Sequence, residues 1–332
     1  MIQSAGVDTE RKIIAILKVL SESSEPLGSI TIARKLEEQG IYLSERAVRY
    51  HLKITDERGY TLPLGRDGRQ LSPKGLEELR IARAPDRLSF IQEKLELLAF
   101  RTTFNPETRE GFLPINTSIF NKNEFPKALK IMKSVIKAGM CVSEFVVIAN
   151  EGEKIGDVVI PEGKIGMGTI CGVTINGVLL KNGVPMESKF GGILEIRNSK
   201  PLRFTAIINY GGTSLDPSEQ YIRARMTSVG DFMKTGNGKI LANFREIPAL
   251  SKPVVEEVIS KLKAAGINGI LQIGGISEPV CQLAVGTNRV GIILIGGLNP
   301  VAAVVEAGFE VDNMAESGII DFKSLISIWQ VN

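Results

Sequence analysis

The chain has 332 residues, of which 43% are hydrophobic, and a formal net charge of +3. This length predicts two or three domains with sizeable cores. The small net charge excludes a polybasic protein, so any DNA contact must come from a local patch. Three isolated cysteines and one histidine exclude a disulfide framework and a zinc site. With no apolar leader and no run of about 20 apolar residues, we expect a soluble cytoplasmic protein without membrane contact.

Residues 29–73 have the pattern of a winged helix-turn-helix. Ser29 is the predicted N-cap of a helix that stops at Gly40, and Ser44 is the predicted N-cap of a second helix that stops at Gly59. A preceding helix, starting near Asp8 or Thr9 and rich in isoleucine and leucine, completes a three-helix core. The segment YTLPLGRDGRQLSP predicts a β-ribbon with two arginines, Arg66 and Arg69, at the tip of its turn.

The second helix of this motif has one cationic face and one apolar face. Its apolar face includes His51, which we interpret as a packing residue. From Arg46 to Lys74 there are seven Lys/Arg against three Asp/Glu, so positive charge is concentrated on the elements that a winged helix presents to DNA. The predicted DNA-binding residues are Arg46, Arg49, Tyr50, Lys53, Arg66 and Arg69.

Two helices are predicted between the wing and residue 101. Ser72-Pro73 opens a short polar helix, and Pro85 starts another with Leu88, Ile91, Leu95 and Leu98 on one stripe. The stripe is consistent either with dimerisation and coupling or with packing on its own domain. We place the domain boundary here, with a DNA-binding domain at 1–84 and a second domain, for effector binding and dimerisation, at 85–332.

The second domain is predicted to be a Gly-rich α/β domain of two similar lobes, at about 101–215 and 216–332. Amphipathic helices at 125–139 and 253–266 lie about 127 residues apart, and each ends in Gly before a strand-like run. An offset of 125 superimposes 164–166 on 289–291 and Gly183 on Gly308. These matches indicate an internal duplication, and the cleft between two lobes is a common place for a small-molecule site.

No motif in this domain predicts catalysis. The run from Gly166 to Gly172 is the densest glycine loop, but its spacing is not that of a dinucleotide-binding fingerprint, and no P-loop is present. Such a loop offers backbone N–H groups that can hold a carboxylate or phosphate. The only histidine lies in the DNA-binding segment, so no nucleophile–histidine pair is available elsewhere. We therefore expect a ligand-binding domain with no catalytic residues, no enzyme activity and no cofactor.

The run GTICGVTINGVLLKNGVPMESKFGGILEI, residues 168–196, closely resembles the effector domain of the NrpR family, archaeal repressors of nitrogen-assimilation genes. The order of domains matches as well, so the resemblance covers nearly the whole chain. It implies a homodimer or higher oligomer that binds a palindromic operator and is released by 2-oxoglutarate. It also raises the question of a second partner protein that consists of the effector domain alone.

The resemblance implies that residues of this run sense 2-oxoglutarate, a small dianion. The predicted effector-binding residues are Thr169, Cys171, Thr174 and Asn176, while Lys181 and Lys189 are interpreted as surface residues. Cys171 is also consistent with a small buried thiol that only packs. Two alternatives stay open: an enzyme attached to a winged helix, and a C-terminal domain that only recruits another protein.

Overall fold

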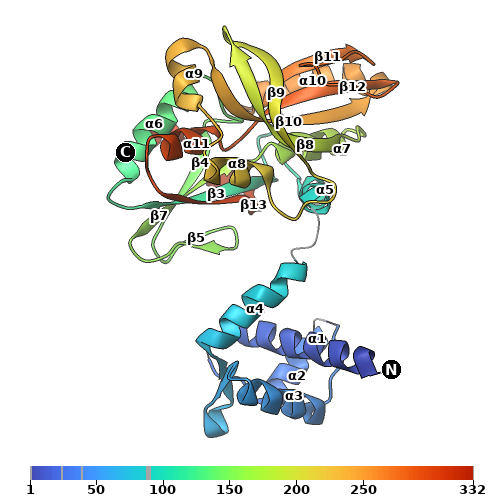
Figure 1. Cartoon of the computed structure of the whole chain (residues 1–332), viewed down its shortest axis with the longest axis vertical. Coiled ribbons are helices and arrows are strands. Elements are labelled where there is room, and N and C mark those ends of the chain that lie inside the picture. Colours follow the sequence, from blue (N-terminus) through green and yellow to red (C-terminus); the bar gives the residue numbers. More distant parts are fainter. Residues whose placement is uncertain (1, 24, 39, 87–90, 332) are drawn as a thin grey trace. The chain divides into compact units, whose positions relative to one another are not determined.

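The computed structural model describes residues 2–23, 25–38, 40–86 and 91–331 (Figure 1). The chain forms two compact units, Met1–Leu88 and Ser89–Asn332, which we call the N-terminal and C-terminal units. Among the described residues, no helix combines the length and the apolar character needed to cross a membrane.

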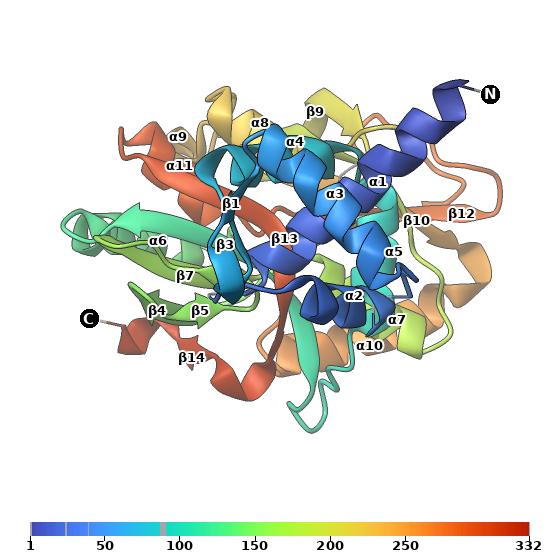
Figure 2. The same cartoon turned by 90° about the horizontal axis from the view of Figure 1, so that it is seen from below.

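The N-terminal unit is a winged helix. Its elements are α1 Ile2–Ser21, α2 Ser29–Glu38, α3 Glu45–Glu57, β1 Thr61–Pro63, the 3₁₀ turn η1 Gly65–Asp67, β2 Arg69–Leu71 and α4 Pro73–Asp86. The first three helices cross one another around a small apolar core (Figure 2). That core contains Ile16, Leu20, Ile32, Leu36, Val48 and Leu52. The predicted fold of this segment is confirmed.

Local signals set the limits of the recognition helix α3. The Ser44 hydroxyl accepts a hydrogen bond from the Ala47 amide at 3.2 Å, as an N-cap does. After α3, the Gly59 amide bonds to the Asp56 carbonyl at 3.0 Å and Gly59 has a φ of 73°. This left-handed conformation favours glycine and ends the helix. Both predicted limits are confirmed.

Three predicted limits nearby are wrong. Ser29 is the first residue of α2 rather than its cap, because the Ile32 amide bonds to the Gly28 carbonyl while the Ser29 hydroxyl donates to Glu45. With no proline to interrupt it, α1 runs from Ile2 through the predicted start near Asp8 and Thr9. Pro85 lies in the last turn of α4 instead of starting a new helix; its missing N–H costs the helix one hydrogen bond, and α4 ends at the next residue, Asp86. The predicted boundary at 84 and 85 therefore falls inside α4, and Leu88 lies outside the described residues.

The C-terminal unit contains two five-stranded antiparallel sheets. In spatial order, the first sheet is β13 Val311–Asp321, β3 Phe112–Asn121, β7 Lys164–Ile170, β4 Phe145–Asn150 and β14 Ile326–Ser327. The second is β11 Ile270–Ile276, β12 Arg289–Ile295, β10 Gly238–Pro248, β8 Glu187–Arg197 and β9 Lys200–Asn209. A small separate hairpin pairs β5 Lys154–Ile155 with β6 Val158–Val159.

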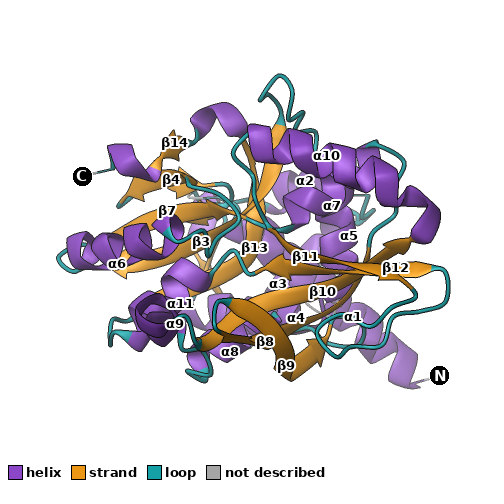
Figure 3. Ribbon diagram, turned by 90° about the horizontal axis from the view of Figure 1, so that it is seen from above, coloured by secondary structure: helices purple, strands orange, loops and turns teal. Residues whose placement is uncertain are grey.

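The helices of this unit form two groups (Figure 3). One group contains α6 Phe125–Lys137, α9 Val229–Thr235 and α11 Asn299–Glu306. The other contains α5 Ile91–Arg101, α7 Val173–Lys181 and α10 Lys252–Ala264. The short helix α8 Pro217–Arg223 contacts β8 and β13.

The element order repeats, which supports the predicted duplication. The series β3-α6-β4-β7-α7-β8 has the same order as β10-α10-β11-β12-α11-β13. However, each repeat gives its last strand to the other sheet, since β8 pairs with β10 and β13 pairs with β3. The predicted lobes at 101–215 and 216–332 are therefore wrong: β8 and β9 belong to the second sheet, and β13 belongs to the first. The exchange ties the two sheets together through the chain itself.

Candidate functional site

The outer face of α3 is a candidate DNA-binding surface. Arg46, Arg49, Tyr50 and Lys53 are all exposed on it. Its inner face buries Val48, Leu52, Thr55 and His51, and the side chain of His51 is only 6% exposed. The interpretation of His51 as a packing residue is confirmed. A rigid helix with long donors on its free face is the arrangement used in major-groove recognition.

Arg49 is held in place before any DNA binds. Its Nη2 lies 2.5 Å from Glu45 Oε1, one helical turn away, and its Nε donates to Ser29 Oγ at 3.3 Å. Ser29 also donates to the same Glu45 oxygen at 3.0 Å. These contacts hold the guanidinium on the α2–α3 side of the surface and use two of its five N–H donors.

The two wing arginines differ in their environment. Arg66 lies exposed in the 3₁₀ turn η1, whereas Arg69 is the first residue of β2 and not at the tip as predicted. The Arg69 guanidinium forms an ion pair with Asp56 of α3, with Nη2–Oδ2 and Nε–Oδ2 distances of 2.9 Å. The Thr61 hydroxyl donates to the other Asp56 oxygen at 2.5 Å. Arg69 therefore fixes the wing to the recognition helix, and Arg66 is the wing arginine free to reach DNA.

Arg245 on β10 is the most unusual residue of the C-terminal unit. Its side chain is 2% exposed, and its Nη1 donates a hydrogen bond to Ser188 Oγ on the neighbouring strand β8. The guanidinium lies 5.8 Å from the centre of the Tyr210 ring, and Nε has no hydrogen-bond partner. Among the described residues, no carboxylate forms an ion pair with it. Because a buried charge is costly without a counter-charge, this arrangement is typical of an anion site.

Glu316 on β13 is a buried acid in the same region. It is 7% exposed, its Oε2 has no hydrogen-bond partner, and Lys94 Nζ of α5 lies 3.8 Å from that oxygen. Burial, followed by repulsion from Asp216, raises the pKa of Glu316 to about 8. The long contact with Lys94 is too weak to offset burial. Near neutral pH the carboxyl group is therefore mostly protonated and can donate a hydrogen bond.

A cavity of about 400 Å³ reaches this region between α5, α7 and the start of β8. Its polar lining consists of Glu96, Asn176, Glu187, Ser188 and Arg289. Asn176 Nδ2 donates to Ser188 Oγ at 3.2 Å, and its buried Oδ1 has no partner. The same serine oxygen accepts from Arg245, so the cavity wall is one hydrogen bond from the buried guanidinium. Its volume lies within the range of small-molecule sites, roughly 300–1,000 Å³.

The predicted effector residues are all buried, and one of the four lines this cavity. Asn176 does so, as described above. Thr169 lies at the end of β7, with its hydroxyl 3.5 Å from the Asn116 amide nitrogen. Thr174 is fully buried in α7. Cys171 packs against α5 and Tyr210, and burial, with a smaller contribution from Glu316, raises the pKa of its thiol to about 12.

The predicted glycine loop is not a loop. Residues 164–170 form strand β7, which pairs with β3 and β4 on its two sides. A Cβ at Gly166 would lie 2.3 Å from Ile160 Cδ1, and one at Gly168 would lie 2.5 Å from Val147 Cγ1. These glycines allow close packing over the strand, and the ladder occupies backbone groups that an anion would need.

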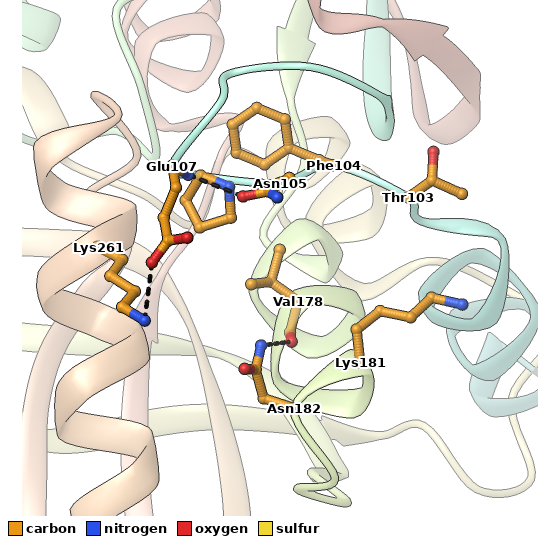
Figure 4. A pocket seen from close by; sticks show the side chains of 9 residues that line it. Thr103, Phe104, Asn105, Glu107, Val178, Lys181, Asn182 and Lys261 are labelled. Atoms are coloured by element: carbon orange, nitrogen blue, oxygen red, sulfur yellow. Dashed lines mark hydrogen bonds and ion pairs between the residues drawn. The ribbon is translucent and has the colours of Figure 1, made fainter.

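A second pocket lies beside α7 on the side of α10 (Figure 4). Figure 4 shows the Lys261 ammonium directed at Glu107, 2.9 Å away, and Lys261 also pairs with Glu257 at 2.9 Å. Lys181 lies over the Phe100 ring at 5.3 Å. Lys261 already has two carboxylate partners, whereas the cavity beside Asn176 also adjoins the buried Arg245 through Ser188 and therefore suits an anion better.

The predicted stripe on α5 packs within its own unit. Ile91, Leu95 and Leu98 are each no more than 5% exposed and contact Cys171, Val173 and Tyr210. Of the two interpretations of the stripe, the structure supports packing on its own domain, because these buried side chains are not available to a second copy.

Comparisons with known proteins match the order of the two units. Residues 14–79 match the family described as the ribonuclease R winged-helix domain, and residues 88–327 match the NrpR regulatory domains NRD1 and 2. The chain belongs to the NrpR family. It is 39% identical to the global nitrogen regulator NrpRI of Methanosarcina mazei over 96% of this chain and 98% of that protein. The predicted resemblance to NrpR is confirmed.

One further relative and one solved structure extend the match. The global nitrogen regulator NrpR of Methanocaldococcus jannaschii is 34% identical over 96% of this chain, which spans 55% of that longer protein. A solved nitrogen repressor-like protein from Methanococcus jannaschii has a TM-score of 0.62 and 29% identity, and covers 72% of this chain and 99% of its own. The NrpR-type fold of the C-terminal unit is thus supported by structure as well as by sequence.

The sequence reading missed Arg245, Ser188, Glu316 and Lys94. One signal for Arg245 was available, because Arg245 and Glu246 are the two charged residues in the largely apolar run ILANFREIPAL, residues 240–250. Adjacent charges inside a strand of this composition are expensive to bury and commonly have a function. Nothing in the sequence shows that Glu316 and Lys94 lie near Cys171.

Proposed function

We propose that this NrpR-family protein is a transcriptional repressor that binds the palindromic operators of nitrogen-assimilation genes and leaves them when 2-oxoglutarate binds. The names of its relatives favour a regulator over the enzymatic alternative. The winged helix and its exposed basic face support DNA binding. The observation that supports effector binding is Arg245, a buried cation with no carboxylate partner among the described residues.

The groups near Arg245 match the chemistry of 2-oxoglutarate. One carboxylate of the effector would pair with the Arg245 guanidinium, which supplies charge-assisted hydrogen bonds. Asn176, Ser188 and the protonated Glu316 offer donors for the remaining oxygens. Thr169 and Cys171 would act on the effector indirectly. Thr169 contacts Asn116, whose Oδ1 accepts a hydrogen bond from the Glu316 amide. Cys171 would act through α5, on which it packs.

Helix α5 is the element through which we expect the effector to act on DNA binding. It is the first helix of the C-terminal unit after the winged helix. Its residues Glu96 and Ala99 line the 400 Å³ cavity, and its apolar stripe packs on Cys171. An effector that binds better when α5 is displaced lowers operator affinity, and operator DNA must weaken effector binding by the same factor.

The decisive test is a thermal or chemical unfolding measurement on the full chain with added 2-oxoglutarate. A bound effector stabilises the folded protein by RT ln(1 + [L]/Kd), about 2.7 kcal/mol at a hundredfold excess over Kd. The effector should also reduce operator binding in a gel shift. No stabilisation at millimolar 2-oxoglutarate would contradict the proposal.

The two wing arginines, Arg66 and Arg69, are expected to have different effects when each is replaced by alanine. Arg66→Ala should weaken binding to all DNA sequences about equally and reduce the slope of log K against log salt by roughly one unit, since it removes one phosphate contact. Arg69→Ala should instead lower the free energy of unfolding, because it leaves Asp56 without its cation, and should disturb the wing. Gel shifts at two salt concentrations and urea unfolding separate the two effects. Equal effects of both variants on the salt slope would contradict the assignment of Arg69.

Cys171→Ser should impair release by 2-oxoglutarate while leaving effector-free operator binding intact. The new hydroxyl would lie among the apolar side chains that seat α5. Cys141→Ser is the matched control, because Cys141 is also a buried thiol with its pKa raised to about 12 by burial, but it belongs to a different part of the core. Gel shifts with increasing 2-oxoglutarate measure release. If folded Cys171→Ser protein loses operator binding, or is released normally, its sensing role is wrong.

We also propose that the functional form is a homodimer or higher oligomer, with a second protein of the effector-domain type as a possible further subunit. A single winged helix reads too few base pairs to select one genomic site, and a two-fold pair reads half-sites one or more helical turns apart. The contact must use a surface other than the α5 stripe, which is buried. Sedimentation of a monomer at micromolar concentration would contradict the homo-oligomer.

A further inference from the structure

Arg289 is a second arginine at the effector cavity. It is the first residue of β12, and its side chain lines the cavity together with Glu187 and Ser188. Its Nη2 lies 2.9 Å from Glu187 Oε2 and donates to the Glu246 carbonyl at 3.3 Å. Its Nε lies 3.6 Å from Glu246 Oε2. With a side chain that is 25% exposed, Arg289 lies nearer to solvent than Arg245 does.

Both carboxylates that hold Arg289 have another partner. Lys189 Nζ lies 2.5 Å from Glu187 Oε1 and 3.4 Å from Glu246 Oε2. The Gly286 amide donates to Glu246 Oε1 at 3.1 Å. The hydrogen bond to Glu187 raises the pKa of Lys189, so the lysine stays charged. Arg289 can therefore exchange its carboxylate for one on a ligand without leaving an unpaired acid behind.

Besides Arg245, this region holds the cations Lys94 and Arg289, and Arg289 is the one that lines the cavity. A dicarboxylate brings two negative charges, and Arg245 compensates one of them. Glu316 adds little negative charge near neutral pH, because burial keeps most of it protonated. Arg289 donates to the backbone carbonyl of Glu246, the residue that follows Arg245 in β10. Arg245 reaches the cavity wall through its hydrogen bond to Ser188, and Arg289 lines the same cavity directly.

The internal duplication shows that this pair belongs to one repeat. The offset of 127 places Ser118 at the position of Arg245, and the offset of 125 places Lys164 at that of Arg289. Ser118 donates to Asn313 at 2.8 Å, and Lys164 donates to Asn121 at 2.7 Å. Both positions in the first repeat are occupied by residues bonded to neutral side chains of the chain itself. The second repeat alone carries two arginines, one buried without a carboxylate and one held by exchangeable carboxylates.

We propose that Arg289 reads the second carboxylate of the effector by exchanging it for Glu187, and that this exchange makes the site selective for dicarboxylates over monocarboxylates. The inference rests on the proposed effector function of the cavity. Bidentate pairing suits this role, because the planar guanidinium binds one carboxylate through two parallel hydrogen bonds. In the empty site Glu187 occupies the Arg289 guanidinium, so the effector must displace it. In the occupied site Glu187 remains paired with Lys189.

Calorimetric titration of the full chain with 2-oxoglutarate and with 2-oxopentanoate tests the inference, since 2-oxopentanoate lacks the distal carboxylate. Wild type should bind 2-oxoglutarate more tightly. Arg289→Gln should lose about tenfold or more in affinity for 2-oxoglutarate and leave 2-oxopentanoate almost unchanged, because one charge-assisted pair is removed. Lys261→Gln is the control, since its lysine belongs to the pocket of Figure 4 and has its own two carboxylates.

Glu187→Gln supplies an independent result with the opposite sign. It removes the competing carboxylate and should tighten binding of 2-oxoglutarate, which a general loss of structure cannot do. If wild type binds 2-oxoglutarate but Arg289→Gln keeps the selectivity, or Glu187→Gln weakens binding, the role of Arg289 is overturned and the effector proposal stands. If wild type binds no 2-oxoglutarate at millimolar concentration, the proposed function fails and this inference fails with it.

Discussion

Arg245→Met is expected to yield a protein that is more stable than wild type in the absence of effector and that no longer responds to 2-oxoglutarate. Wild type holds a buried guanidinium with no carboxylate partner among the described residues. Methionine fills the space of the aliphatic stem without a charge. Replacement of buried ionic groups by apolar ones of similar volume is neutral or stabilising by about 1–4 kcal/mol. Ser188 keeps one hydrogen bond, from Asn176.

Urea unfolding with and without 2-oxoglutarate measures both effects at once. Wild type should gain about 2.7 kcal/mol at a hundredfold excess of effector over Kd, and the variant should gain nothing. Operator binding without effector should persist in both. Arg203→Met is the control, because Arg203 is half exposed on β9 and paired with Glu195. A variant that is less stable than wild type, or that still gains stability with effector, would show that Arg245 serves the fold and not the ligand.

Arg245 is expected to lower the stability of the fold while it serves the response to 2-oxoglutarate. This explains why a prediction of the fold from the sequence does not find it. Sequence patterns indicate residues that stabilise a fold, whereas Arg245 is buried in β10 at a cost to stability. Its position in a largely apolar strand was visible, but its hydrogen bond depends on the strand β8 that pairs with β10. That pairing joins residues more than fifty positions apart and leaves no local signal.

The winged helix was predictable because its limits are local. Ser44 and Gly59 act through hydrogen bonds within a few residues, so the sequence alone places α3 correctly. The function of Arg69 was not predictable in the same way. Its ion pair with Asp56 requires β2 to fold back on α3, which turns an expected DNA contact into a contact between the wing and the recognition helix.

The duplication was also visible in the sequence, but its consequence was not. A constant offset shows that two segments share an element order, and it says nothing about which strands pair. The exchange of β8 and β13 between the sheets follows from the hydrogen-bonded pairing of β8 with β10 and of β13 with β3. The same limit applies to β7, where the glycines looked like an anion-binding loop until the partners on both sides of the strand were known.

Glu316→Gln is expected to remove a pH dependence from the stability of the folded protein. Burial raises the pKa of Glu316 to about 8, above the usual value of 4.5 that it has in an unfolded chain. Between these pH values the folded state holds a proton that the unfolded state has lost, so wild type loses stability as pH rises through this window. Glutamine imitates the neutral acid at every pH. The gap between variant and wild type should open by up to about 1.4 kcal/mol per pH unit and stop growing above pH 8.

Urea unfolding from pH 4 to 9 tests this expectation, and the neighbouring groups Asp216, Glu219, Lys94 and Arg245 remain in both proteins. Glu195→Gln is a control of opposite sign. Hydrogen bonds from Arg203 and Arg197 lower the pKa of Glu195, so its contribution exists above the usual carboxyl pKa and disappears as pH falls. That variant should be the weaker protein at neutral pH and equal to wild type in acid. A Glu316→Gln difference that stays constant from pH 5 to 8 would mean that Glu316 is ionised in the folded protein, and with it that the site offers 2-oxoglutarate a negative charge where we assign a hydrogen-bond donor.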